Sequence, residues 1–137
     1  MESGTERRDE AVAVVGGGSW GTALANAAAA AGRPVTLWMR DPDAAARMEQ
    51  ARANERYLPG VALHPGVRAT AEPAGLNAAG TVLLVVPAQT LRGVLAALAP
   101  SLAPGAAIVL CAKGIERGSD AFMSAVAADV LPPGAPV

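Results

Sequence analysis

A short apolar segment that runs directly into three glycines constrains the fold of this chain more than any other feature. Residues Ala11–Val15 (AVAVV) are continuously apolar, and Gly16 ends the segment. A continuous apolar segment of this length is typical of a strand that is buried on both faces. A helical pattern of small residues, Ser19–Ala31, follows, and Gly32 stands at a C-cap position after it. A buried strand that turns through glycine into a helix predicts a parallel α/β sheet.

The same alternation of strand and helix continues along the chain. Further strands are predicted at Val35–Met39, Val67–Thr70 (weak), Thr81–Val86 and Ala106–Cys111. Further helices are predicted at Pro42 to about Ala53, at Gln89–Ala99 and at Ser119–Leu131, with one helical turn at Pro73–Asn77. Asp41 is the expected N-cap of the second helix, and Ser119 or Asp120 that of the last. Right-handed crossovers then give a Rossmann-type doubly wound sheet with helices on both faces, its first three strands ordered 3-2-1 and the fourth beside the first.

The glycine segment itself, Gly16–Gly21 (GGGSWG), fits the pattern G-x-G-x-x-G between a predicted strand and a predicted helix. In that setting Gly16 allows a tight turn, Gly18 lets a diphosphate approach the backbone, and Gly21 lets the helix pack close to the strand. The N–H groups of the first helical turn are then free to hold phosphate oxygens. The motif predicts a dinucleotide site, and the alternative is a strand–helix turn with no ligand.

Three other strand ends should converge on this loop. The second strand ends in Arg40 and Asp41, where an acid would bond the ribose 2′-OH of NAD and an arginine would accommodate the 2′-phosphate of NADP. Both residue types are present, so the sequence does not choose between NAD and NADP as cofactor. Alternatively, Asp41 only caps the next helix. Pro87 follows the fourth strand, at the nicotinamide half. Lys113, the only lysine, follows the fifth and can reach a phosphate or a developing alkoxide, or can be an ordinary surface lysine.

Composition excludes several other classes. With 11 Lys and Arg against 12 Asp and Glu, the net charge of −1 gives no electrostatic reason to expect nucleic acid or an anionic membrane as partner. His64 has no second ligand at metal-binding spacing, and the single cysteine, Cys111, fits a reducing cytosol. Residues 1–10 are polar and are expected to be a disordered leader rather than a signal peptide. No apolar segment is long enough to predict a membrane-spanning helix.

Five sequence blocks together resemble a known family. The blocks are GGGSWGTALA (Gly16–Ala25), LWMRDPD (Leu37–Asp43), NERYLPGVAL (Asn54–Leu63), VVPAQTLR (Val85–Arg92) and CAKGIE (Cys111–Glu116). In this order they resemble bacterial NAD(P)-dependent glycerol-3-phosphate dehydrogenase. The resemblance implies reduction of dihydroxyacetone phosphate to sn-glycerol 3-phosphate in the cytoplasm, for phospholipid synthesis, with NAD or NADP as cofactor.

The resemblance also implies roles for single residues. Ser19, Trp20, Arg40 and Tyr57 would contact the cofactor, and Lys113 would contact both cofactor and substrate. Many members of the family carry a second basic residue after the one that corresponds to Arg40. This chain has an aspartate there, so the resemblance does not choose between NAD and NADP.

The family's chains are longer than this one. The resemblance predicts that residues 11–137 are an incomplete NAD(P)-binding domain whose C-terminal part is missing, together with the helical substrate domain. The catalytic general acid/base lysine is accordingly expected beyond Val137, with no catalytic residue in this chain. The fifth strand would then be an exposed apolar edge, which predicts edge-to-edge pairing into a homodimer. Two alternatives stay open: a non-catalytic dinucleotide-binding module, and a Rossmann reductase acting on another small ketone or imine.

Overall fold

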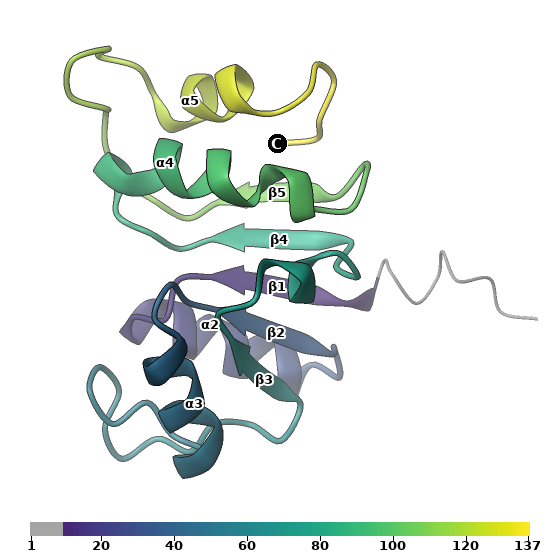
Figure 1. Ribbon diagram of the computed structural model, residues 1–137, viewed down its shortest axis with the longest axis vertical. Coiled ribbons are helices and arrows are strands. Elements are labelled where there is room, and N and C mark those ends of the chain that lie inside the picture. Colours follow the sequence, from purple (N-terminus) through teal and green to yellow (C-terminus); the bar gives the residue numbers. More distant parts are fainter. Residues whose placement is uncertain (1–9) are drawn as a thin grey trace, which may run out of the picture.

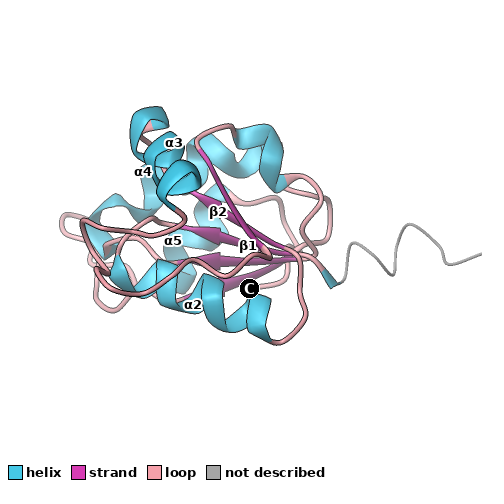
Figure 2. Ribbon diagram, turned by 90° about the horizontal axis from the view of Figure 1, so that it is seen from below, coloured by secondary structure: helices cyan, strands magenta, loops and turns pink. Residues whose placement is uncertain are grey.

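Five parallel strands form one sheet in the order β3-β2-β1-β4-β5 in the computed structural model, which describes residues 10–137. This is the predicted doubly wound order, in which successive strands are added outward from β1 on one side and from β4 on the other, and the sheet is Rossmann-like. Figure 1 shows the strands side by side, and Figure 2 shows helices on both sides of the sheet. The strands are β1 (Val12–Val15), β2 (Val35–Trp38), β3 (Val67–Thr70), β4 (Thr81–Leu84) and β5 (Ala107–Leu110).

The central strand β1 has no exposed face. Ala13, Val14 and Val15 are all 0% exposed, as their continuous apolar sequence predicts for a strand covered on both sides. Val15 lies opposite Trp38 of β2 and opposite Leu84 of β4. Because the strands are parallel and in register, their carboxyl ends lie along the same edge of the sheet.

Each face of the sheet has its own hydrophobic core. Helices α2 (Ser19–Ala30) and α3 (Pro42–Ala51) contribute to one core, in which the small side chains of Ala25 and Ala29 pack against the sheet. The other core is covered by the 3₁₀ turns η1 (Pro73–Leu76) and η2 (Ala99–Ser101) and the helices α4 (Ala88–Leu98) and α5 (Met123–Val130). The second 3₁₀ turn was not predicted and simply extends α4.

The predicted helix ends are confirmed in α2 and α3. The Asp41 carboxylate accepts a hydrogen bond of 2.9 Å from the Asp43 N–H, so Asp41 is the N-cap of α3, with Pro42 next. Gly32 follows α2 with φ +90°, and its N–H donates to the Ala29 carbonyl at 2.9 Å. A left-handed residue of this kind ends a helix with little strain only when it is glycine.

The predicted start of the last helix is wrong. Helix α5 begins at Met123 rather than Ser119, its N-cap is Phe122, and neither Ser119 nor Asp120 caps it. Gly118 and Asp120 both have positive φ, at +89° and +54°, so this segment cannot continue a helix. The Ser119 hydroxyl instead donates to the Glu116 carboxylate at 2.6 Å.

The outer edge of β5 is the end of the sheet, as expected, but the C-terminal segment reaches it. The Ile108 N–H donates to the Pro136 carbonyl at 2.9 Å, whereas Val109 is 41% exposed. The predicted leader lies almost wholly outside the described residues, which begin at Glu10. Within the described part of the chain, no helix has the length and apolar character needed to cross a membrane.

Candidate functional site

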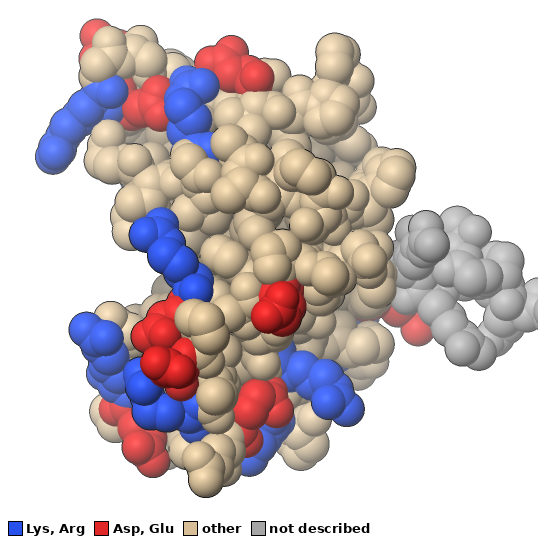
Figure 3. Space-filling view, viewed as in Figure 1, with Lys and Arg blue, Asp and Glu red and all other residues tan. Residues whose placement is uncertain are grey.

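The predicted site residues are brought to one edge of the sheet. Because β1 is in register with β2 and β4, and β4 with β5, the four segments that leave these strands start along the same edge. Figure 3 shows Lys and Arg side chains projecting along the edge toward which the strand arrows of Figure 1 point. The residues that follow these strands include Gly16, Arg40, Pro87 and Lys113.

Two of the three motif glycines are required by close contacts. Gly16 has φ +126°, and a Cβ there would lie 2.2 Å from the Val85 carbonyl oxygen. A Cβ on Gly21 would lie 2.0 Å from the Gly16 carbonyl oxygen. The turn and the close approach of helix to strand that the motif predicts are therefore present, and no residue with a side chain fits at either position without a backbone shift.

The third motif glycine faces open space. A Cβ on Gly18 would have no neighbour within 4 Å, and Gly18 has an extended backbone with φ −78°. It stands at the N-cap of α2 without a side-chain cap, and the first turn of that helix has no acidic residue. The Thr22 N–H donates to the Gly18 carbonyl at 3.1 Å. The N–H groups of the three residues before Thr22 have no intrahelical acceptor, so the positive end of α2 is open to an anion. Open space beside free N–H groups fits a diphosphate.

Asn54 fixes the shape of this loop, and sequence reasoning missed it. Its side-chain amide donates to the Gly17 carbonyl at 2.9 Å and to the Thr22 hydroxyl at 2.8 Å. Its side-chain oxygen accepts from the Tyr57 N–H at 3.2 Å. Asn54 is 5% and Thr22 is 1% exposed, so these bonds are shielded from water. The segment that carries Tyr57 is therefore tied to the glycine loop, and the only available sequence signal was that Asn54 opens the block NERYLPG.

A cavity of about 250 Å³ lies between the glycine loop, α3 and the segment after Asn54. Arg47 and Arg56 are among its lining residues, and the Arg56 guanidinium lies 4.9 Å from the centroid of the half-exposed Tyr57 ring. The carboxylate of Asp41 caps α3 and lies 4.0 Å from Arg47. Asp41 is thus the N-cap of α3, while Arg40, which follows β2, is exposed.

The loop after β5 packs on the start of α4. Gly114 has φ +127°, and a Cβ there would lie 3.3 Å from the Ala88 Cβ, which brings the segment around Lys113 next to the end of β4. Lys113 is exposed, and within residues 10–137 its ammonium group has no hydrogen bond or salt bridge. An exposed cation at the carboxyl edge of the sheet can hold a phosphate or stabilise a developing alkoxide.

Titratable groups near this loop have shifted pKa values. The hydrogen bond from Arg92 holds the pKa of Glu116 below its ordinary value, and the hydrogen bond from Ser119 acts in the same direction. Burial raises the pKa of the Cys111 thiol. A raised pKa disfavours the thiolate, which is the reactive form of a cysteine side chain.

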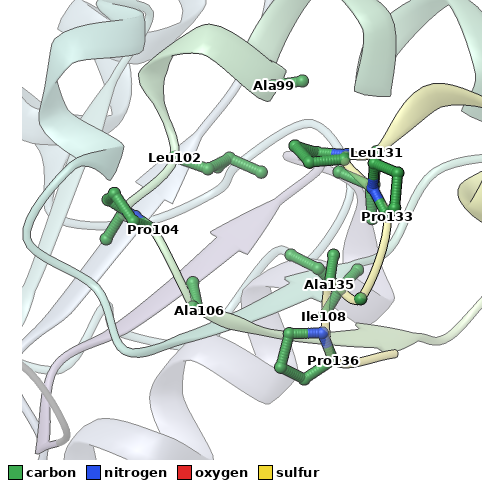
Figure 4. Close-up of a pocket in the computed structure, with 13 residues that line it drawn as sticks. Ala99, Leu102, Pro104, Ala106, Ile108, Leu131, Pro133, Ala135 and Pro136 are labelled. Carbon is green, nitrogen blue, oxygen red and sulfur yellow. The ribbon is translucent and has the colours of Figure 1, made fainter.

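Other features lie away from this edge. An apolar cavity of about 340 Å³ lies at the amino end of β5, and Figure 4 shows it lined by Ala, Leu, Ile and Pro side chains, none of which could bind phosphate. The Nδ1 atom of His64 accepts from the Gly66 N–H at 2.9 Å, so this side chain stabilises a turn. Residues 10–137 contain no cluster of His, Cys, Asp and Glu suited to a metal ion.

Comparison with known proteins decides the family. The family model described as "NAD-dependent glycerol-3-phosphate dehydrogenase N-terminus" matches residues 11–137. The chain belongs to this family. It is similar to the glycerol-3-phosphate dehydrogenase [NAD(P)+] of Methylobacterium radiotolerans, with 66% identity over 124 residues, which are 90% of this chain and 37% of that protein. The corresponding protein of Azorhizobium caulinodans is 54% identical over 126 residues, covering 92% of this chain and 38% of the relative.

The fold agrees with that of solved family members. The crystal structure of glycerol-3-phosphate dehydrogenase from Coxiella burnetii matches with a TM-score of 0.83 and 31% identity, covering 90% of this chain and 38% of that one. The chain thus spans well under half the length of the glycerol-3-phosphate dehydrogenases it matches. Membership in this family does not favour the alternatives of a non-catalytic module or a reductase for another ketone or imine.

Proposed function

We propose that this chain is the dinucleotide-binding domain of an enzyme that reduces dihydroxyacetone phosphate to sn-glycerol 3-phosphate with NADH or NADPH. The observation that carries the proposal is the uncapped N-terminus of α2, which follows Gly18 beside the switch point between β1 and β4, where the order of strand addition reverses. Ligands of doubly wound sheets bind at such a switch point. The names of the relatives, glycerol-3-phosphate dehydrogenase [NAD(P)+], support the choice of substrate and cofactor.

The residues divide between the two halves of the dinucleotide. The backbone at Gly16, Gly18 and Gly21, with the first turn at Ser19 and Trp20, would hold the diphosphate. Arg40 and Tyr57 would contact the adenosine half, beside the cavity next to α3. Pro87 and Lys113 would lie at the nicotinamide half, with Lys113 also touching the substrate.

The chemistry requires little of these residues beyond binding and orientation. The bound dinucleotide supplies the hydride, as nicotinamide cofactors do. The Lys113 ammonium group would orient the substrate and stabilise negative charge that develops on its carbonyl oxygen. The proton for that oxygen would come from a general acid in the rest of the enzyme, in keeping with the lysine expected beyond Val137.

Titration of the purified chain with NADH tests the cofactor site. Trp20, which is 61% exposed on the glycine loop, supplies a fluorescence signal close to the proposed diphosphate. Gly18→Ala should raise the Kd at least about tenfold, because the new methyl group takes the space through which the diphosphate approaches. Gly93→Ala is the matched control, since a Cβ on Gly93 in α4 also has no neighbour within 4 Å. Equal Kd values for Gly18→Ala and the parent chain would contradict the site.

Activity is the test of the whole proposal. The 137-residue chain should bind the dinucleotide without reducing dihydroxyacetone phosphate, whereas the protein extended through the helical domain should reduce it. In a thermal-shift assay, substrate added after NADH should stabilise only the extended protein further. Absence of that added stabilisation, with NADH still bound, would favour the non-catalytic module instead.

The setting of the protein is part of the proposal. A single cysteine and a net charge of −1 support function in the cytoplasm without nucleic acid as a partner. The outer edge of β5, which the C-terminal segment bonds at Ile108 but where Val109 is 41% exposed, supports edge-to-edge pairing of two copies of the isolated chain into a homodimer. Light scattering that shows only monomer over a wide concentration range would contradict the dimer.

A further inference from the structure

The loop that carries Lys113 is held by side chains of α4, and this arrangement suggests a role for a residue outside the proposed binding site. We propose that Gln89 is a positioning residue that fixes the loop and thereby sets the position of Lys113; the proposal rests on the role of Lys113 given above. Gln89 lies in the first turn of α4, which begins at Ala88 after the short segment that follows β4. Its place in the fold therefore joins the switch point to the loop after β5.

The side-chain amide of Gln89 holds the loop by two backbone hydrogen bonds. Its nitrogen donates to the Ile115 carbonyl at 2.9 Å, and its oxygen accepts from the Arg117 N–H at 2.9 Å. The single amide thus satisfies a backbone acceptor and a backbone donor on alternate residues of one segment. Both ends of the amide are used, so no shorter or apolar side chain at this position could replace the pair of bonds.

A second side chain of α4 holds the residue between those two. The Arg92 guanidinium bonds the Glu116 carboxylate through Nε and Nη2 at 3.0 to 3.1 Å. Its Nη2 also lies 3.1 Å from an oxygen of Asp129 in α5. Gln89 and Arg92 are three residues apart and so lie on the same face of the helix. Together they hold three consecutive loop residues, 115 to 117.

The other hydrogen bonds of the loop, such as those from the Glu116 N–H to the Ala121 carbonyl and from the Asp120 N–H to the Glu116 carbonyl, are internal to it and do not hold it against α4. Gly114, Gly118 and Asp120 all have positive φ, so the segment follows no regular secondary structure. Ile115 and Phe122 form an isolated antiparallel bridge, yet their side chains are 49% and 66% exposed and bury little apolar surface. The position of the loop therefore depends on hydrogen bonds from α4, and loss of those bonds should leave Lys113 mobile.

Lys113 can be observed directly because it is the only lysine of the chain. Reductive methylation with ¹³C-formaldehyde labels this side chain and the N-terminal amine and keeps the positive charge of both. The NMR linewidth and relaxation of the labelled Lys113 methyl groups report its mobility without any ligand. A titration with NADH followed by the same signal gives the Kd. The relaxation data report how firmly Lys113 is held, and the titration reports cofactor binding, so the two properties are measured separately.

The variants are Gln89→Ala and Glu116→Gln, with Gln50→Ala as control. Gln50 is an exposed glutamine in α3, and its side chain makes no hydrogen bond with residues 10–137. Both test variants should make the Lys113 methyl groups more mobile than in the parent chain. Gln89→Ala should also raise the Kd for NADH by about fivefold, because a mobile Lys113 must then be ordered when the cofactor binds. The control should change neither.

Unchanged Lys113 relaxation in Gln89→Ala would overturn the proposal, whatever the result for Glu116→Gln. Increased mobility with an unchanged Kd would overturn the claim that the loop position matters for the cofactor. If the parent chain itself bound no NADH, the proposed function would fail, while the relaxation data would still show whether Gln89 positions Lys113. Far-UV circular dichroism confirms that each variant is folded before the comparison.

Discussion

Replacement of Gly21 by alanine tests the close packing of α2 on β1. In a helix, alanine is favoured over glycine by about 1 kcal/mol, so secondary-structure propensity alone predicts a more stable protein. The structure predicts the opposite, since the new Cβ would lie 2.0 Å from the Gly16 carbonyl oxygen, where real Cβ atoms essentially never approach below 3.0 Å. The helix or the turn must therefore move by about 1 Å.

The expected loss of stability follows from the backbone that the new Cβ would displace. The clash is with backbone, and α2 is held against the sheet by Ala25 and Ala29, which are 0% and 4% exposed. Overpacking of this kind costs up to about 3 kcal/mol. After the gain of about 1 kcal/mol in helix propensity, Gly21→Ala should lower the free energy of unfolding by about 2 kcal/mol. For a domain of this size, that corresponds to a Tm about 6 °C lower.

Urea unfolding followed by far-UV circular dichroism measures the effect. Gly93→Ala is the control, because Gly93 is also in a helix but a Cβ there has no neighbour within 4 Å. This control should gain about 1 kcal/mol, which places the two variants about 3 kcal/mol apart. If Gly21→Ala were as stable as Gly93→Ala, the packing of α2 against Gly16 would not be as described.

Three further predictions concern single side chains. Asp41→Ala should cost about 1 kcal/mol in urea unfolding because the N–H of Asp43 loses its acceptor, and Asp41→Asn should restore most of the loss. Arg92 lowers the folded-state pKa of Glu116. This ion pair therefore stabilises the fold at pH values above the ordinary carboxyl pKa of about 4.3. Its contribution is lost as the pH falls through the lower, folded-state pKa. The stability difference between the parent chain and Glu116→Gln should therefore be present at neutral pH and vanish in acid, and a difference independent of pH would contradict the pair. Arg40→Ala should raise the Kd for NADPH more than that for NADH, and equal changes in the two titrations would exclude contact with the 2′-phosphate.

The strands were predictable because the sheet is parallel. Its interior strands are covered on both faces, so they appear in the sequence as continuous apolar segments between glycines and prolines. Even the weak strand β3 was found at its observed bounds, Val67–Thr70. Strand ends were less accurate: β4 was expected to reach Val86 but ends at Leu84. The positions of Gly16, Arg40, Pro87 and Lys113 at one edge followed directly from the strand order.

The parts that sequence reasoning missed depend on contacts between distant residues. The Asn54 side chain bonds Gly17 and Thr22, more than 30 positions away, and no local pattern announces such a contact. Ser119 looked like a helix cap because capping is a local preference. In the fold its hydroxyl bonds Glu116, which Arg92 in turn holds from α4. A residue's preference for a helix cap therefore does not predict its role where a tertiary contact uses the same side chain.

The complete burial of β1 has a consequence for dynamics. Its amides bond to strands on both sides and its side chains at 13, 14 and 15 are 0% exposed, so hydrogen exchange there should require unfolding of the whole domain. The loop from Gly114 to Phe122 lacks such protection and should exchange through local opening. One side of the proposed site is thus formed by residues that follow β1, whose amides should exchange slowest. The other side is formed by a loop whose amides should exchange fast. A bound ligand would consequently leave deuterium uptake in β1 unchanged and reduce it mainly in that loop.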